Sequence, residues 1–311
     1  MSNIETDVRS SVTTIRARPI IRTKSGVALW PPLRRFITAE RLLGARMGRN
    51  PYTSFLYEFV RFGMKQAWAC LFGGIMVALL IFTYLFYPQN AALARYDFLV
   101  IASIVVQIAL LYFRLETPTE AGVIFIYHIT GTIMEIFKVS VGSWIYPEPS
   151  LLRVAGVPLF TGFMYAAIGS YIFRCWRLFE FRFTYHPPLW ALAALSVAIY
   201  ANFFVHHYIF DFRYILFAIT GLLLWRTQVY YRPWKHWRSM PLILGFFLVA
   251  LFIWLAENIG TFAKVWLYPH QVNTWQFVAF PKLGSWFLLV IISYMLVAII
   301  NRPVSIDESK R

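Results

Sequence analysis

The sequence predicts an all-α, polytopic membrane protein with about eight transmembrane helices, arranged as two parallel four-helix repeats. Three observations predict this fold: the composition, the spacing of long apolar segments, and a motif that occurs twice. Of the 311 residues, 59% are hydrophobic and only 14% are charged, whereas a soluble domain has about 25% charged residues. Much of the protein surface is therefore expected to face lipid rather than water.

Eight segments are apolar and about long enough to cross a bilayer core as helices, which takes roughly 20 residues each. Backbone polar groups in lipid must be satisfied within the segment, as they are in a helix. The segments do not alternate between apolar and polar residues, as the strands of a membrane barrel do. The predicted spans are 66–87, 96–113, 120–142, 158–176, 188–205, 212–229, 241–260 and 281–300.

The distribution of Lys and Arg predicts the orientation. With the N-terminus placed inside, 23 of the 29 basic residues fall in inside segments and 5 fall outside. Basic residues concentrate on the cytoplasmic side, so we expect both termini to lie in the cytoplasm. The net charge of +15 does not indicate a nucleic-acid partner, because the basic residues lie in loops between apolar spans.

The remaining segments complete the predicted organisation. Residues 1–32 are basic, with few apolar residues, and are expected to be disordered. Residues 33–65 mix Arg with Leu, Phe and Tyr, which predicts an interfacial amphipathic helix and contact with anionic lipid. The first repeat then covers 66–176, the second covers 177–300, and a cytoplasmic tail covers 301–311.

The motif Glu-x8-Trp-x-Tyr-Pro occurs once in each predicted repeat, near the outer end of the third and of the seventh span. Self-similarity of this kind indicates a duplication. Four spans per repeat is an even number, so the two copies are parallel, as in several transporters. The members of the motif are Glu135, Trp144 and Tyr146 in the first copy, and Glu257, Trp266 and Tyr268 in the second.

Glu135 and Glu257 are the candidate catalytic residues. Inserting an ionisable group at the centre of a membrane helix costs on the order of 3 kcal/mol, so two of them at equivalent places predict a pair that faces a shared cavity. The Trp and Tyr residues of the motif would line the binding site. The alternative is that each Glu only anchors a neighbouring helix or the aromatic residues that follow it.

Further polar residues extend the candidate binding site. His128 lies seven residues before Glu135, on the same helix face. Glu148 and His270 occupy equivalent positions after the two motifs, where a histidine–carboxylate pair can relay protons. Lys138 and Lys264 are candidate counter-ions of the two Glu residues, or extend towards the interface.

No cofactor or metal is predicted. His206, His207 and Asp211 follow the fifth span, but the spacing of known zinc motifs is absent, and a metal site needs three or four convergent ligands. Nucleotide-binding loops and the nucleophile elbow of hydrolases are also missing from the sequence.

Two resemblances follow from the motif and its surroundings. The segment 116–174 carries His128, Glu135, Trp144-x-Tyr146-Pro147 and Gly156-Val157-Pro158-Leu159. In this it resembles the YoaT-like family of uncharacterised bacterial integral membrane proteins. The resemblance implies a multi-pass protein of the bacterial inner membrane but no activity.

The order of a Glu, a Trp-x-aromatic motif and a Pro at the next span is also similar to the repeats of membrane-bound lycopene cyclases and carotenoid hydratases. This resemblance implies acid–base chemistry on long isoprenoids within the bilayer. The cyclases carry acidic residues just after that Pro, where this sequence has Leu159 and Lys282. Only Glu135 and Glu257 therefore carry over.

Three functions remain open from the sequence. The first is an acid–base enzyme that acts on a lipophilic, isoprenoid-like molecule. The second is a small-solute or proton-coupled transporter that uses the same Glu pair, and the third is a membrane binding or scaffold protein. A closed, apolar pocket between the third and seventh spans would favour the enzyme, and a water-accessible path would favour transport.

Overall fold

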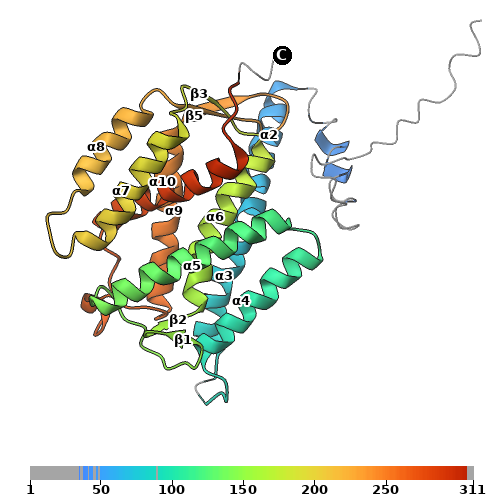
Figure 1. Ribbon diagram of the computed structural model, residues 1–311. Coiled ribbons are helices and arrows are strands. Elements are labelled where there is room, and N and C mark those ends of the chain that lie inside the picture. Colours follow the sequence, from blue (N-terminus) through green and yellow to red (C-terminus); the bar gives the residue numbers. More distant parts are fainter. Residues whose placement is uncertain are drawn as a thin grey trace, which may run out of the picture.

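The computed structural model describes residues 50–88 and 90–306, together with residues 35, 38–40, 42–44 and 47. The predicted disordered segment 1–32 and the last five residues of the predicted tail lie outside these ranges. The described chain is mostly helical (Figure 1). Its helices are α2 (Pro51–Ala69), α3 (Leu71–Phe86), α4 (Arg95–Tyr112), α5 (Pro118–Ser140), α6 (Phe160–Phe179), α7 (Leu189–Val205), α8 (Arg213–Leu224), α9 (Leu242–Phe262) and α10 (Pro281–Asn301), with a 3₁₀ turn at Pro269–Gln271.

In the part of the chain that the structure describes, four helices are long and apolar enough to cross a membrane: α4, α5, α9 and α10. The number rises to five if α2 and α3, which meet at an angle of 68°, form one broken span. These helices indicate a membrane protein. Each of the eight predicted spans contains a helix, but α7 and α8 are shorter apolar helices, and α6 carries Arg174 and Arg177.

Two predicted spans have different boundaries in the structure. The first, 66–87, is divided at Cys70, because α2 ends there and α3 begins in a new direction. The sixth, 212–229, is helical only to Leu224. Its last residues enter a strand, and the Thr227 hydroxyl donates to the carbonyl of Tyr185.

The all-α prediction missed two small antiparallel sheets, which form where loop backbones satisfy their polar groups by pairing with one another. Their strands are β1 (Arg153–Val154) and β2 (Val157–Pro158) in one sheet, and β3 (Arg182–Thr184), β4 (Gln228–Tyr231) and β5 (Arg238–Pro241) in the other. The turn between β1 and β2 holds Ala155 and Gly156 at φ of 48° and 83°, as a two-residue hairpin turn of type I′ requires. The two sheets lie at opposite ends of the helices (Figure 1).

Close approach of α5 to α6 is possible because glycines stand at their contact. A Cβ on Gly162 would lie 2.3 Å from Nδ1 of His128, and one on Gly169 would lie 2.5 Å from the ring of Tyr127. Small residues at helix contacts are typical of membrane proteins, where van der Waals packing holds the helices together. The two most buried helices are α6 and α10, which contact each other near the centre of the fold.

Several arginines form ion pairs inside the fold or at its edge. Arg174 of α6 and Glu116, which precedes α5, are both fully buried and approach to 2.6 Å. At the β3–β5 end, Arg238 pairs with Glu58 at 2.7 Å, and the Lys65 ammonium donates to the carbonyls of Leu178 and Arg232. These contacts hold α2 against the sheet and give it a direction different from that of α3.

Candidate functional site

The two copies of the Trp-x-Tyr motif lie side by side at the β1–β2 end. Ile145 and Leu267, the middle residues of the two copies, exchange backbone hydrogen bonds of 2.9 Å in each direction. The ring of Trp144 meets the ring of Tyr268 edge to face, with centroids 5.9 Å apart. Residues 122 positions apart in the chain are thereby joined, and the ends of α5 and α9 are held together.

Glu135, on α5, is buried and accepts three hydrogen bonds. Its Oε2 accepts from the indole Nε1 of Trp144 at 2.7 Å and from the hydroxyl of Tyr146 at 2.6 Å. Its Oε1 accepts from the hydroxyl of Tyr165, on α6, at 2.7 Å. A carboxylate has about four lone-pair sites, so three donors leave one open.

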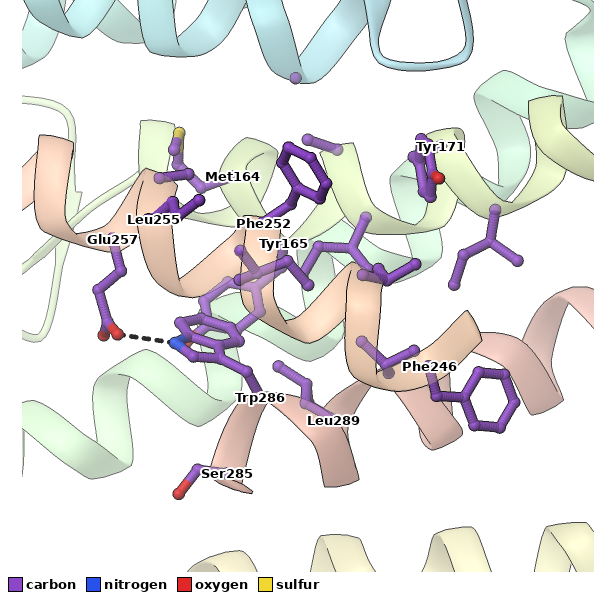
Figure 2. Close-up of a pocket in the computed structure, with 18 of the residues that line it drawn as sticks. Met164, Tyr165, Tyr171, Phe246, Phe252, Leu255, Glu257, Ser285, Trp286 and Leu289 are labelled. Atoms are coloured by element: carbon purple, nitrogen blue, oxygen red, sulfur yellow. Dashed lines mark hydrogen bonds between the residues drawn. The ribbon is translucent and has the colours of Figure 1, made fainter. Parts of the chain in front are cut away.

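Glu257, on α9, is equally buried and accepts two hydrogen bonds. The hydroxyl of Tyr268 donates to Oε1 at 2.5 Å, and the indole of Trp286, on α10, donates to Oε2 at 2.7 Å (Figure 2). Trp266 is the motif partner of Trp144, but its ring packs over Gly260 instead of bonding Glu257. The two Glu residues thus have similar but not identical partners.

The two motif tyrosines lie in loops beyond the helix ends. Burial raises the pKa of Tyr146 and of Tyr268 well above the ordinary value, and the adjacent carboxylates of Glu135 and Glu257 raise it further. Both hydroxyls therefore keep their protons and act as donors to the carboxylates.

Two lysines line the cavity near Glu135 and Glu257. The Lys282 ammonium, at the start of α10, is 5.1 Å from the ring centroid of Trp144 and 4.6 Å from that of Tyr268, within the range of cation–π attraction. Lys138, a predicted counter-ion, contacts Nε2 of His207 at 2.8 Å instead of a carboxylate. Lys264, the other predicted counter-ion, is exposed in a loop.

The six motif residues line one end of a cavity of about 1320 Å³. This volume is larger than the roughly 300–1,000 Å³ of sites for drug-sized molecules. Away from the Glu end the lining is mainly apolar, and Figure 2 shows Phe246, Phe252 and Leu289 along it. It continues to Phe179 and Tyr231 near the β3–β5 end, so the cavity suits a long apolar molecule.

The cavity opens at the side of the fold. Several small residues of α2 and α3 line it and are also exposed: Gly63, Ala67, Cys70 and Gly74. On α9 the same holds for Phe252, 71% exposed, and Leu255, 45% exposed. A residue that lines a cavity and is exposed marks an opening, and this opening lies between apolar helices.

Three predicted binding residues lie outside the cavity lining. His128 packs its ring on Phe163 of α6, with centroids 4.5 Å apart. Glu148 forms an ion pair with Arg95 at 2.7 Å, while the exposed His270 stacks on Tyr268. Glu148 and His270 thus have different partners, and the predicted proton relay between them is not assembled.

The sequence prediction did not assign three residues of the site. These are Tyr165 and Trp286, which donate to the two Glu residues, and Lys282, which lies against Trp144 and Tyr268. All three lie in the first two turns of the helix that follows a motif. For Tyr165 and Trp286, the sequence signal was a polar aromatic residue in the first two turns of a largely apolar helix. In the described part of the chain, no cluster of three or more His, Cys, Asp or Glu side chains is placed to hold a metal ion.

Comparison with known proteins identifies the family. A family model described as "Protein of unknown function (DUF817)" matches residues 58–294. The chain belongs to the DUF817 family. It is also 41% identical to "Uncharacterized protein YoaT" of Bacillus subtilis (strain 168) over 241 residues, which are 78% of this chain and 90% of YoaT. No solved structure matches the chain.

These matches confirm the resemblance to the YoaT-like family. The region shared with the DUF817 family contains both Glu135 and Glu257, all the motif residues, and the lysines beside them. The similarity to lycopene cyclases and carotenoid hydratases stays a prediction.

Proposed function

We propose that this DUF817 protein binds a lipophilic molecule in its cavity and carries out acid–base chemistry on it with Glu135 and Glu257. The observation that carries the proposal is the position of two buried carboxylates at one end of a long apolar cavity. The opening between α3 and α9 supplies an entry route from the bilayer. An isoprenoid-like chain is the substrate that the resemblance to lycopene cyclases and carotenoid hydratases implies.

The hydrogen bonds of the two Glu residues support this role. Five aromatic donors orient the carboxylates, so that each points to a defined place. Glu257 accepts two hydrogen bonds and Glu135 three, so by the count of about four lone-pair sites Glu257 keeps more capacity to accept a substrate proton. We assign proton abstraction to Glu257 and proton return to Glu135, which first takes up a proton from solvent at its one open site. Glu257 then releases its proton to solvent, so that both carboxyl groups end each cycle ionised.

The apolar lining favours this function over transport of a small solute. A hydrated solute would need polar groups along its path, whereas the cavity wall away from the Glu end is made mainly of Phe, Leu, Ile and Val. A scaffold role would leave the cavity without a purpose.

The membrane arrangement is part of the proposal. We propose that the eight apolar helices α3 to α10 are two parallel repeats, with both termini in the cytoplasm of a bacterial cell. Helix α6 packs on α5 and α3 as α10 packs on α9 and α7, and the paired motif loops lie between the two sets. The excess of Lys and Arg on the side of the termini supports the orientation.

The test uses the protein purified from membranes in a mild detergent. Mass spectrometry of an organic extract identifies the lipophilic molecule that purifies with it. That molecule is then incubated with the protein in D₂O, and deuterium incorporation is measured. We expect exchange by the wild type and a loss of about 100-fold or more in Glu135→Gln and Glu257→Gln, since general acid–base catalysis contributes roughly 10²–10⁴-fold.

The control variant is Glu180→Gln, because this side chain is exposed and pairs with Arg232 at the β3–β5 end, away from the Glu pair. It is expected to keep the wild-type exchange rate. The proposal is wrong if no lipophilic molecule accompanies the protein, or if both Gln variants exchange deuterium as fast as the wild type.

A further inference from the structure

Two lysines line the Glu end of the cavity without a carboxylate partner. In the described part of the chain, all seven ion pairs are made by arginines. Lys138 and Lys282 take part in none of them, although Lys138 is only 4% exposed and both line the cavity. A buried charge in apolar surroundings is costly unless an opposite charge compensates it.

The neighbours of Lys138 are neutral acceptors. Its ammonium contacts Nε2 of His207 at 2.8 Å and Nε2 of His206 at 3.4 Å. Nδ1 of His206 lies 2.8 Å from the carbonyl of Asn202, so it carries the proton and leaves Nε2 to accept. Burial lowers the pKa of both imidazoles, and the nearby ammonium lowers it further. Both rings stay neutral, and one of the three ammonium protons is left for a ligand.

Lys282 has still more donor capacity. Its ammonium lies against the faces of Trp144 and Tyr268, and no hydrogen bond from it to the described residues is found. The rings hold the cation in place without using its donors. All three protons are available to a group in the cavity.

The two Glu carboxylates do not neutralise these lysines directly. Their oxygens are occupied by indole and phenol donors, and neither lies within 4.0 Å of a lysine ammonium, the limit for an ion pair. Both lysines line the Glu end of the same cavity, Lys138 beside His206 and His207 and Lys282 against Trp144 and Tyr268. An anion there would accept the hydrogen bonds that both ammonium groups have left.

We propose that the ligand of this cavity is an amphiphile with an anionic headgroup of phosphate or carboxylate type, which Lys138 and Lys282 bind at the β1–β2 end. The inference rests on the proposed function, because it requires that the cavity holds a lipophilic molecule. The apolar tail lies along Phe246 and Phe252, towards the opening. The headgroup site then sets which part of the tail reaches Glu135 and Glu257.

The test compares headgroups on one tail. The purified full chain in a non-ionic detergent is titrated with eicosyl phosphate, eicosanoic acid, eicosanol and eicosylamine, and binding is followed by tryptophan fluorescence. A hydrogen bond to a charged group contributes about 1.5–3 kcal/mol, and 1.4 kcal/mol is about tenfold in affinity. We therefore expect the phosphate and the carboxylate to bind at least about tenfold more tightly than the alcohol and the amine.

Variants locate the site. Lys138→Met and Lys282→Met should each remove most of this advantage and leave the affinity for eicosanol unchanged. Lys138→Arg and Lys282→Arg should retain a preference for the phosphate, because the charge is kept. Lys264→Met is the matched control, since this lysine is exposed and outside the cavity lining, and it should behave as the wild type.

The outcomes separate the two proposals. If eicosanol or eicosylamine binds as tightly as eicosyl phosphate, the anionic headgroup is refuted, while the lipophilic cavity stands. If inorganic phosphate alone displaces eicosyl phosphate with equal affinity, the site takes a free anion and the amphiphile is refuted. If no eicosyl probe binds, the proposed function fails as well. The wild-type comparison needs no variant, so it decides the matter even where a Met variant does not fold.

Discussion

Glu135→Ala is expected to destabilise the protein strongly, because it leaves three donors inside the fold without an acceptor. These are the indole N–H of Trp144 and the hydroxyls of Tyr146 and Tyr165. An unsatisfied buried polar group costs about 1–3 kcal/mol, so the three together cost about 3–9 kcal/mol. This is comparable with the whole stability of a typical domain, about 5–15 kcal/mol.

Glu135→Gln is expected to be much milder, at about 1–3 kcal/mol, because all three donors keep a partner. The amide oxygen can accept from Trp144 and Tyr146 on the Oε2 side. The amide nitrogen then faces Tyr165, whose hydroxyl has lone pairs and can accept as well as donate. What is lost is the difference between charged and neutral hydrogen bonds, about 1 kcal/mol for each bond.

Glu257 provides a comparison within the same molecule. It has two donors, Tyr268 and Trp286, so Glu257→Ala is expected to cost about 2–6 kcal/mol, less than Glu135→Ala. Stability is measured by titrating mixed micelles with sodium dodecyl sulfate and following tryptophan fluorescence. If Glu135→Ala is as stable as Glu135→Gln, the three donors find water or other acceptors when the carboxylate is removed. That result would refute the reasoning that Glu135 is their only acceptor among the described residues.

Three further predictions concern other parts of the structure. Glu116→Ala should cost about 3–5 kcal/mol in the same titration, because it leaves the fully buried Arg174 unpaired. Gly162→Leu should prevent close packing of α5 on α6, since even a Cβ there would lie 2.3 Å from a side chain of α5. The variant should be absent from membranes or should unfold at a lower concentration of sodium dodecyl sulfate than the wild type. A membrane-permeant maleimide should label the exposed Cys70 at the cavity opening and spare the buried Cys175, and a bound lipophilic molecule should slow the labelling.

Each of these has a control or a contrary outcome. Glu180→Ala removes a pair that is largely exposed on both sides, and it should cost less than about 1 kcal/mol. Gly122→Ala places its new Cβ in open space and should not destabilise α5. Labelling of Cys175 as fast as Cys70 would contradict the assigned opening of the cavity.

Local information was enough for the apolar helices and for the motif. A run of about 20 apolar residues has to be a helix in lipid whatever surrounds it, so each of the eight predicted spans contains a helix. The Glu-x8-Trp-x-Tyr spacing lets the chain turn after a helix and bring the phenol back to the Glu in both copies, and the indole in the first copy only. The contact of Glu135 with Trp144 and Tyr146 therefore depends on residues within one segment.

The tertiary structure decided what depends on how segments pack. The bend at Cys70 accompanies the packing of α2 on α6 and its ion pair with Arg238 of β5. The early end of α8 accompanies the pairing of β4 with β3 and β5. His128 shares a helix with Glu135, yet its ring packs on Phe163 outside the cavity lining. Whether a residue of α5 reaches the cavity depends on where α6 packs, which the spacing along α5 does not determine.

The sequence by itself thus determined which segments are helices and that two glutamates belong to repeated motifs. Only the tertiary structure decided which donors reach those glutamates and which cations stand beside them. Tyr165, Trp286 and Lys282 come from helices whose positions are set by packing rather than by spacing along the chain. A buried carboxylate forms hydrogen bonds with the donors that the fold brings within about 3 Å of it. The order of residues along the chain does not determine which donors from other helices come that close.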